Sequence, residues 1–231
     1  PFVSLTDPGT GLEKMAQDYG FGQIFSNPAD IGGRYSVLSL FGLVPAALLG
    51  LDITRLLDRA AGMAERCRQQ EDTKANPGAY LGAVMGSLAK TGRDKVTVIA
   101  SPALAAFGLW VEQLLAESTG KEGTGLIPIA QEPVVKPSAY GTDRFFVYLK
   151  LKGEKNGALD RAVQALAEAK HPVLQFDLRD RYDLGAEFFR WEFATAIAGH
   201  VLGIHPFDQP NVQESKDNTN RVLDTFQSTG R

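Results

Sequence analysis

The chain has 231 residues, of which 44% are hydrophobic and 22% charged, as is ordinary for a globular protein with its own core. A formal net charge of -3 gives no reason to expect nucleic acid or an anionic membrane as a partner. One cysteine excludes an internal disulfide framework and fits a reducing compartment, and no cysteine–histidine cluster has zinc spacing. The longest apolar run, residues 38–51, is too short to span a bilayer, and no signal peptide is visible. We therefore expect a cytoplasmic protein with no nucleic-acid or membrane partner.

The first elements predict a strand–helix–strand unit. Residues 2–6 and 23–25 are strand-like, and apolar side chains recur at helical spacing between residues 12 and 19. Such a unit is typical of parallel sheets. Because a buried parallel strand needs elements that cover it, we expect the chain to be a piece of a longer protein, cut inside a domain.

The loop at residues 26–39 follows the second strand, where parallel sheets usually place their ligands. Gly32 and Gly33 would let the backbone approach a ligand closely and would leave Arg34 projecting. Arg34 could then hold a phosphate group or a developing enolate. The alternative is an ordinary surface arginine beside a Gly-Gly turn.

Two helices and a linker should follow. Residues 38–49 are apolar on nearly all sides, which predicts a buried helix. Asp52 should cap a second helix, from residue 53 to about residue 70, and the charged residues 66–74 suggest a solvated helix end and a linker. We place a domain boundary near residues 72–76.

The rest of the chain alternates strands with helices, which predicts a second parallel sheet covered by helices. An Asn-Pro pair at residues 76–77 starts a helix whose small residues allow close packing. Residues 95–100 are β-branched and apolar in the manner of a central strand. Further strands are expected at residues 126–131, 145–151 and 173–178, and helices at residues 101–117, 159–169 and 183–202.

A polar, glycine-containing loop at residues 116–128 separates a helix from a strand. It holds the carboxylate of Glu117, the hydroxyl of Ser118 and the ammonium group of Lys121, which suit a polar, oxygen-rich ligand. The same residues are also typical of a helix end, with Gly120 as a left-handed cap and Lys121 at the negative end of the dipole.

The stretch at residues 203–216 links two helices. Pro206 breaks the preceding helix, and Pro210 is placed to open the next one. Lys216 would lie about two turns into that helix. A lysine there could be part of a site or simply solvated.

Three segments together resemble phosphoglucose isomerase, the glycolytic enzyme built from two sugar-isomerase (SIS) domains. They are residues 32–39, residues 117–121, and residues 205–212 leading to Lys216, in the family's order and rough spacing. The third segment and residues 183–189 look most like the isomerase half of the bifunctional transaldolase/glucose-6-phosphate isomerase proteins. The resemblance covers nearly all of residues 1–226.

The resemblance implies an α/β protein with the three-layer SIS fold, a mainly parallel sheet and flanking helices. Residues 1–75 would be the C-terminal remainder of a first SIS domain, and residues 76–231 the second SIS domain with its C-terminal helices. The whole protein is expected to be a homo-oligomer that acts on a sugar phosphate without metal or organic cofactor.

The family's roles carry over at matching positions. Glu117 would move a proton between C1 and C2 of the open-chain sugar, Arg34 would stabilise the cis-enediolate, and Lys216 would assist ring opening. The substrate-binding residues implied are Gly32, Gly33, Ser118, Gly120, Lys121 and Gln209. The chemistry is coherent, because aldose–ketose interconversion needs one base and a positive group where the enediolate charge develops.

Two features of the family are missing. Its phosphate-binding loops belong to the first SIS domain upstream of residue 2, so the chain alone should be nearly inactive. Its ring-opening histidine follows a Thr-Asp pair, but here residues 142–143 are followed by Arg144. His171, His200 and His205 lie elsewhere and are expected to be structural, which leaves ring opening to Lys216 or to spontaneous mutarotation.

Two other functions stay open. SIS domains also serve as non-catalytic sugar-phosphate sensors, although a sensor has no need of a base such as Glu117. A dual-specificity phosphoglucose/phosphomannose isomerase would share the same motifs, because the shape of the pocket reads the configuration at C2.

Overall fold

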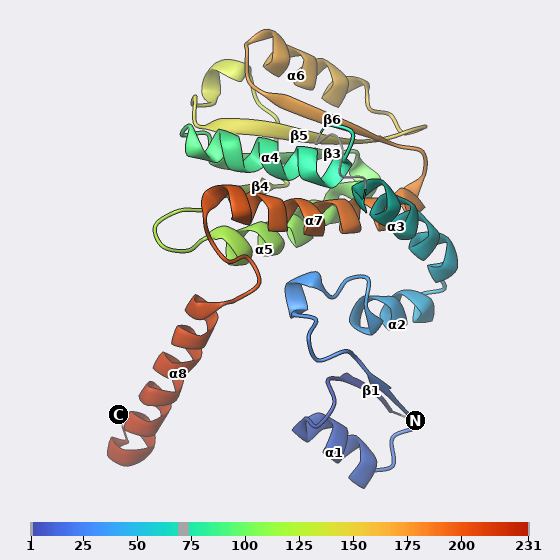
Figure 1. Ribbon diagram of the computed structural model, residues 1–231, viewed down its shortest axis with the longest axis vertical. Coiled ribbons are helices and arrows are strands. Elements are labelled where there is room, and N and C mark those ends of the chain that lie inside the picture. The colour runs from blue at the N-terminus through green and yellow to red at the C-terminus, as the bar shows by residue number, and fades with distance from the viewer. Residues whose placement is uncertain (1, 69–73, 231) are drawn as a thin grey trace.

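The chain folds around two parallel sheets, one of four strands and one of two, in a computed structural model that describes residues 2–68 and 74–230 (Figure 1). The larger sheet has the order β4-β3-β5-β6, and every neighbouring pair is parallel. Its strands are β3 (Lys95–Ala100), β4 (Ile127–Ala130), β5 (Arg144–Leu151) and β6 (Val173–Leu178). The four strands expected from the sequence are thus confirmed, each to within one residue.

Helices cover both faces of the larger sheet and give three layers (Figure 1). Alternate residues of β5 point to opposite faces, so Phe145 and Val147 join one apolar cluster while Phe146 and Tyr148 join the other. The first cluster is completed by α4 (Pro77–Lys90), α5 (Ala105–Thr119) and α7 (Leu184–Leu202), and the second by α6 (Gly157–Glu168). Burial of both faces explains why β3 and β5 have few polar residues.

Small residues bring α4 against α7. A Cβ atom added at Gly82 would lie 2.4 Å from the carbonyl oxygen of Ala194, and one at Gly86 would lie 2.7 Å from Cβ of Val201. Asn76 caps α4, since its Oδ1 accepts from the backbone N–H of Ala79 at 2.9 Å. The expected helix start and its close packing are both confirmed.

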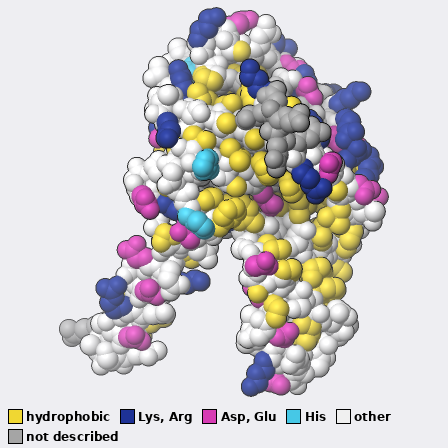
Figure 2. All heavy atoms as spheres, viewed as in Figure 1, with side chains coloured by type: hydrophobic (Ala, Val, Ile, Leu, Met, Phe, Trp, Pro, Cys, Tyr) yellow, Lys and Arg dark blue, Asp and Glu magenta, His cyan; other side chains and the backbone are white. Residues whose placement is uncertain are grey.

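The N-terminal region holds the smaller sheet. Strand β1 (Val3–Thr6) and strand β2 (Gln23–Ser26) are parallel and are joined by α1 (Gly11–Asp18), which confirms the strand–helix–strand unit. Figure 2 shows hydrophobic side chains on the surface of this N-terminal region and a hollow between it and the C-terminal helix.

Helix α2 (Leu40–Leu48) is shorter than predicted and is not buried, so that expectation was wrong. Leu48 is 76% exposed and Leu49 is 80% exposed. An apolar sequence does not by itself bury a helix, because other elements must cover its faces. Among the described residues, other elements cover only part of α2, and Val44 is its buried residue.

Helix α3 (Ile53–Arg68) packs against α7 and therefore belongs to the helix layer of the larger sheet. Its start confirms the predicted cap, because the Asp52 carboxylate accepts from the backbone N–H of Arg55 at 3.0 Å. Residues 69–73, which include most of the predicted linker and the first two residues of the predicted boundary at 72–76, lie outside the described residues. The division at residues 75 and 76 stays a prediction.

Helix α8 (Pro210–Thr229) begins at the predicted proline and extends away from the larger sheet (Figure 1). None of its described residues is buried. Short 3-10 helices lie at Gly33–Tyr35, Pro102–Leu104, Pro137–Ala139 and Arg181–Asp183. Across residues 2–68 and 74–230, the helices include none with the length and apolar character needed to cross a membrane.

Candidate functional site

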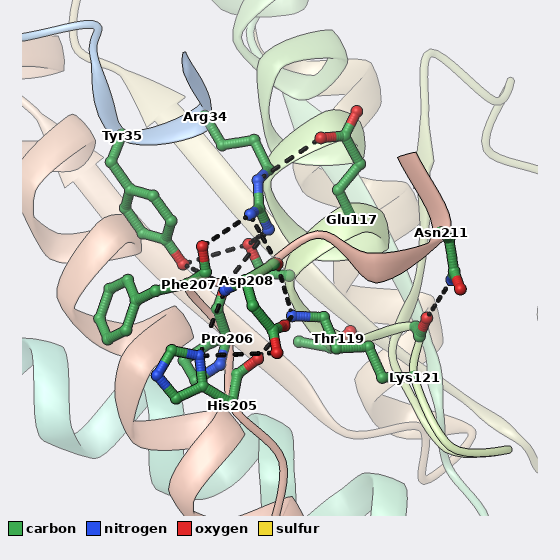
Figure 3. Close-up of polar contacts among 12 residues, drawn as sticks. Arg34, Tyr35, Glu117, Thr119, Lys121, His205, Pro206, Phe207, Asp208 and Asn211 are labelled. Atoms are coloured by element: carbon green, nitrogen blue, oxygen red, sulfur yellow. Dashed lines mark hydrogen bonds and ion pairs between the residues drawn. The ribbon is translucent and has the colours of Figure 1, made fainter. Parts of the chain in front are cut away.

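Three segments that are distant in sequence meet beside the C-terminal end of α5 (Figure 3). Arg34 comes from the 3-10 helix after β2, and Glu117 and Ser118 come from the last turn of α5. The third contribution is residues 205–208, which we call the α7–α8 turn. These are the three segments that carried the resemblance, and the structure brings them together.

Arg34 is buried at the centre of this cluster, with 5% of its surface exposed. Its Nη1 donates to Oγ of Ser118 at 2.7 Å and to the carbonyl of Pro206 at 3.2 Å, and its Nη2 donates to the carbonyls of Phe207 and Asp208 at 3.2 and 2.9 Å. Its Nε lies 3.4 Å from the Glu117 carboxylate. A guanidinium group has five N–H donors. Protein oxygens accept hydrogen bonds from both Nη atoms here, and Nε faces the Glu117 carboxylate. The alternative of an ordinary surface arginine is excluded.

Glu117 lies at the rim of the cluster with 34% of its side chain exposed. One carboxylate oxygen faces Nε of Arg34, and the other accepts from Nε2 of Gln113 at 3.3 Å. Gln113 is one helical turn earlier on α5, so the (i, i+4) spacing was a signal that sequence reasoning missed. The carboxylate is thus oriented from both sides and still open to solvent.

Ser118 and Tyr35 form the buried side of the cluster. Ser118 is fully buried, and its Oγ accepts from Arg34 and, at 3.1 Å, from the Tyr35 hydroxyl. Burial raises the pKa of Tyr35 above its ordinary value, so the phenol stays neutral and can donate this hydrogen bond. The structure therefore places Ser118 behind Arg34, where it supports the arginine. Tyr35 was not singled out in the sequence.

Gly120 ends α5, but not in the left-handed conformation that the capped-helix alternative expects. Its φ is -73°, and its N–H donates to the carbonyl of Ala116 at 2.9 Å. A Cβ atom there would lie 2.7 Å from that carbonyl oxygen, so the close approach requires glycine. Positive φ values occur two and three residues later, at Glu122 and Gly123.

Lys121 turns toward the α7–α8 turn, not toward the end of its own helix. Its ammonium group donates to the carbonyl oxygens of His205 and Asp208 and pairs with the Asp208 carboxylate. Hydrogen bonding from Lys121 holds the pKa of the Asp208 carboxyl below its ordinary value. Asp208 is a further residue that sequence reasoning missed.

Gly32 and Gly33 are exposed, and neither has a positive φ. A Cβ atom at either position would meet nothing within 4 Å. Neither the backbone nor the packing of the described residues requires glycine at these positions. The space in front of them is open to a ligand or to another segment.

Two predicted residues lie apart from the cluster. Gln209 is exposed at the start of α8, and its backbone carbonyl accepts from the N–H groups of Val212 and Gln213. Lys216 is exposed on α8, and the described residues include no contact between it and Glu117 or Arg34. The structure does not bring Lys216 into the site.

The three histidines lie in different surroundings. The ring of His171 packs against Tyr140 and Phe146, and His200 is exposed near the end of α7. His205 is in the α7–α8 turn, where its Nδ1 accepts from the backbone N–H of Asp208 at 3.2 Å. Across the described ranges, no group of three or more His, Cys, Asp or Glu side chains could hold a metal ion.

The arrangement has the parts of an acid–base site. A solvent-accessible carboxylate can accept and return a proton, and the adjacent guanidinium places positive charge where an oxyanion would develop. The fold and the cluster together define an α/β protein with parallel sheets and a carboxylate–arginine site at the C-terminal end of a helix.

No family model matches the chain, but sequence comparison finds similar proteins. The chain is 30% identical over 261 residues to a glucose-6-phosphate isomerase of Leptospira biflexa, covering 95% of this chain and 57% of that protein. It is 32% identical over 255 residues to the corresponding protein of Rubrobacter xylanophilus, covering 93% and 58%. Most of the chain is thus similar to glucose-6-phosphate isomerases, and it spans somewhat more than half the length of these proteins.

Solved structures show the same fold. A hypothetical protein of Thermus thermophilus matches with a TM-score of 0.84 at 23% identity, covering 96% of this chain and 62% of that one. A glucose-6-phosphate isomerase from Chlamydia trachomatis matches with a TM-score of 0.75 at 20% identity, covering 98% and 53%. The expected α/β fold with parallel sheets and flanking helices is therefore confirmed.

Proposed function

We propose that this chain carries the acid–base centre of an aldose–ketose isomerase that interconverts glucose 6-phosphate and fructose 6-phosphate. The observation that carries the proposal is the ion pair between Glu117 and Arg34, 3.4 Å apart, in a chain about 30% identical to glucose-6-phosphate isomerases. Gln113 and Arg34 orient the carboxylate while leaving it accessible. These features suit a base that must take and return one proton.

In the proposed reaction, Glu117 removes the proton from C2 of the open-chain aldose, and the electron pair of that C–H bond forms the cis-enediolate. Glu117 then returns the proton at C1, while the hydroxyl proton moves from O2 to O1, so the sugar is neither oxidised nor reduced as a whole. Arg34 stabilises the negative oxygen through its charge, since its Nη1 and Nη2 groups already donate to protein acceptors. Lys216 assists ring opening only if α8 brings it closer; otherwise the ring opens spontaneously.

The remaining features are proposals about the complete protein. We take the chain to be the C-terminal portion of a two-domain SIS protein. Residues 1–75 would be the C-terminal remainder of the first domain, with α3 packed against α7 of the second, and residues 76–231 would be the second domain. The missing part would carry the phosphate-binding loops, and a transaldolase domain could precede it. We further propose a cytoplasmic homo-oligomer without metal or organic cofactor.

The Glu117→Gln variant of the complete protein tests the base. Glutamine keeps the shape of the side chain but cannot take the proton, so turnover should fall by about 10²- to 10⁴-fold. A coupled assay for glucose 6-phosphate formation measures this, with Glu122→Gln, in the exposed loop, as the matched control. Unchanged turnover in Glu117→Gln would refute the assignment. Binding of fructose 6-phosphate without turnover in the unaltered protein would favour a sensor, and turnover of mannose 6-phosphate would indicate dual specificity.

A further inference from the structure

The ammonium group of Lys121 is fully used by the α7–α8 turn. It lies 2.5 Å from the carbonyl oxygen of His205 and 2.7 Å from that of Asp208, and it also pairs with the Asp208 carboxylate. A lysine has three N–H donors, so none remains for a ligand. Lys121 is also buried, with 8% of its surface exposed. These contacts argue against direct substrate binding by Lys121.

Arg34 holds the same turn from the other side (Figure 3). Lys121 donates to the first and last of four consecutive carbonyls, and Arg34 donates to the second, third and fourth. Within the described part of the chain, none of these four oxygens accepts a backbone N–H. The Pro206 carbonyl also accepts from the Tyr35 hydroxyl at 3.3 Å, whereas the other three carbonyls have donors only from the two cations among the described residues. Since a partly buried carbonyl that loses its donor is costly, the conformation of the turn depends mainly on the two cations.

The α7–α8 turn also sets the position of α8. No described residue of α8 is buried, so the helix has no packed face to hold its direction. Apart from the turn, the link to the α5 loop is the hydrogen bond from Nδ2 of Asn211 to the carbonyl of Gly120, at 3.1 Å. Lys121 therefore connects the loop after Glu117 to the start of α8, the helix that carries Lys216.

We infer that Lys121 is a positioning residue that, together with Arg34, fixes the α7–α8 turn and the start of α8 against the Glu117 loop. The expected effect of Lys121 on catalysis rests on the proposed function, but its expected effect on the α7–α8 turn and α8 does not. Removal of the ammonium group releases the turn and α8 and leaves the larger sheet intact.

Hydrogen exchange followed by mass spectrometry on the 231-residue chain tests the structural part. In Lys121→Met, backbone amides at residues 204–216 should exchange at least about tenfold faster, while those of β3 and β5 are unchanged. Lys14→Met, at an exposed position of α1, is the matched control and should leave both regions unchanged. If Lys121→Met does not fold, Asp208→Asn, which weakens one of the three contacts, should show a smaller increase in the same region. Unchanged exchange at residues 204–216 in a folded Lys121→Met variant would overturn the inference. If Lys121→Met does not fold, unchanged exchange at these residues in Asp208→Asn would overturn it.

Kinetics of the complete protein test the catalytic part. A positioning role predicts that Lys121→Met lowers kcat by about tenfold or more with little change in KM for fructose 6-phosphate. A raised KM with unchanged kcat would show that Lys121 binds substrate and would overturn the inference. If the unaltered protein has no isomerase activity, the proposed function fails, and the exchange measurement still decides the role of Lys121.

Discussion

The Nε atom of Arg34 lies 3.4 Å from Oε2 of Glu117 and joins the loop after β2 to the last turn of α5. The guanidinium group is almost completely buried, whereas about a third of the carboxylate side chain is exposed. A fixed charge in such surroundings acts more strongly than it would in water. The geometry of the candidate base thus depends on two elements that the chain brings together only on folding.

Replacing Arg34 by lysine should destabilise the chain although the charge is kept. A lysine cannot reproduce the planar set of donors, so Ser118 and carbonyls of the α7–α8 turn would lose their partners. We expect the free energy of unfolding, measured by urea denaturation, to fall by at least about 2 kcal/mol.

The matched control is Arg55→Lys, because Arg55 pairs with Asp180 at the surface with 47% of its side chain exposed. That change should cost less than about 1 kcal/mol. Equal effects of the two substitutions would contradict the structural role of Arg34.

Gly120→Ala should destabilise the end of α5. The added Cβ atom would lie 2.7 Å from the backbone carbonyl oxygen of Ala116, which cannot move without unwinding the last turn. The expected loss of unfolding free energy is about 1–3 kcal/mol, measured by thermal or urea denaturation.

Gly33→Ala is the control for this prediction, since nothing lies within 4 Å of its added Cβ atom. Its stability should change by no more than about 0.5 kcal/mol. Loss of turnover in the complete protein with unchanged stability would indicate that a ligand approaches Gly33. A destabilisation of Gly33→Ala as large as that of Gly120→Ala would show that the close contact with Ala116 does not explain the need for glycine at residue 120.

Glu192 should make stability depend on pH. It lies on α7, and its Oε1 is buried with no hydrogen-bond partner among the described residues. Burial raises its pKa from 4.5 to about 8, so the folded chain holds this proton more tightly than the unfolded chain does. The contribution of the Glu192 carboxyl group to the free energy of unfolding is therefore complete below pH 4.5 and is lost as the pH rises toward 8.

The measurement compares unfolding free energies of the unaltered chain and Glu192→Gln between pH 5 and pH 8, in the window set by the raised pKa of Glu192. The unaltered chain should lose up to about 1.4 kcal/mol per pH unit relative to the variant. Glu168→Gln, at an exposed position of α6, should not change the slope. Parallel curves for the unaltered chain and Glu192→Gln would refute the prediction.

Local patterns in the sequence predicted much of the fold. The apolar runs of β3 and β5, the caps at Asp52 and Asn76, and the helix start at Pro210 appear in the structure as expected. Each of these elements depends on residues that are close together in sequence, within one strand or near one helix end. A local sequence pattern is therefore enough to predict them.

The surroundings of those elements could not be predicted in the same way. The apolar pattern of α2 does not say which of its faces other elements cover, and Leu48 and Leu49 are exposed. The glycine pattern after Glu117 suggested a left-handed Gly120, but a close contact with Ala116 sets its conformation. Both outcomes depend on which atoms are neighbours after folding.

For the candidate site, the sequence by itself determined the residue types and their order: an arginine after two glycines, a glutamate at a helix end, a lysine, and a proline-containing turn. Only the tertiary structure decided which partners they meet. Arg34 and Lys121 are long side chains whose donors satisfy four carbonyls of the α7–α8 turn, while Lys216 stays outside on α8. The physical reason is that a cation binds whichever shielded acceptors folding brings within reach, and sequence spacing does not encode those long-range distances.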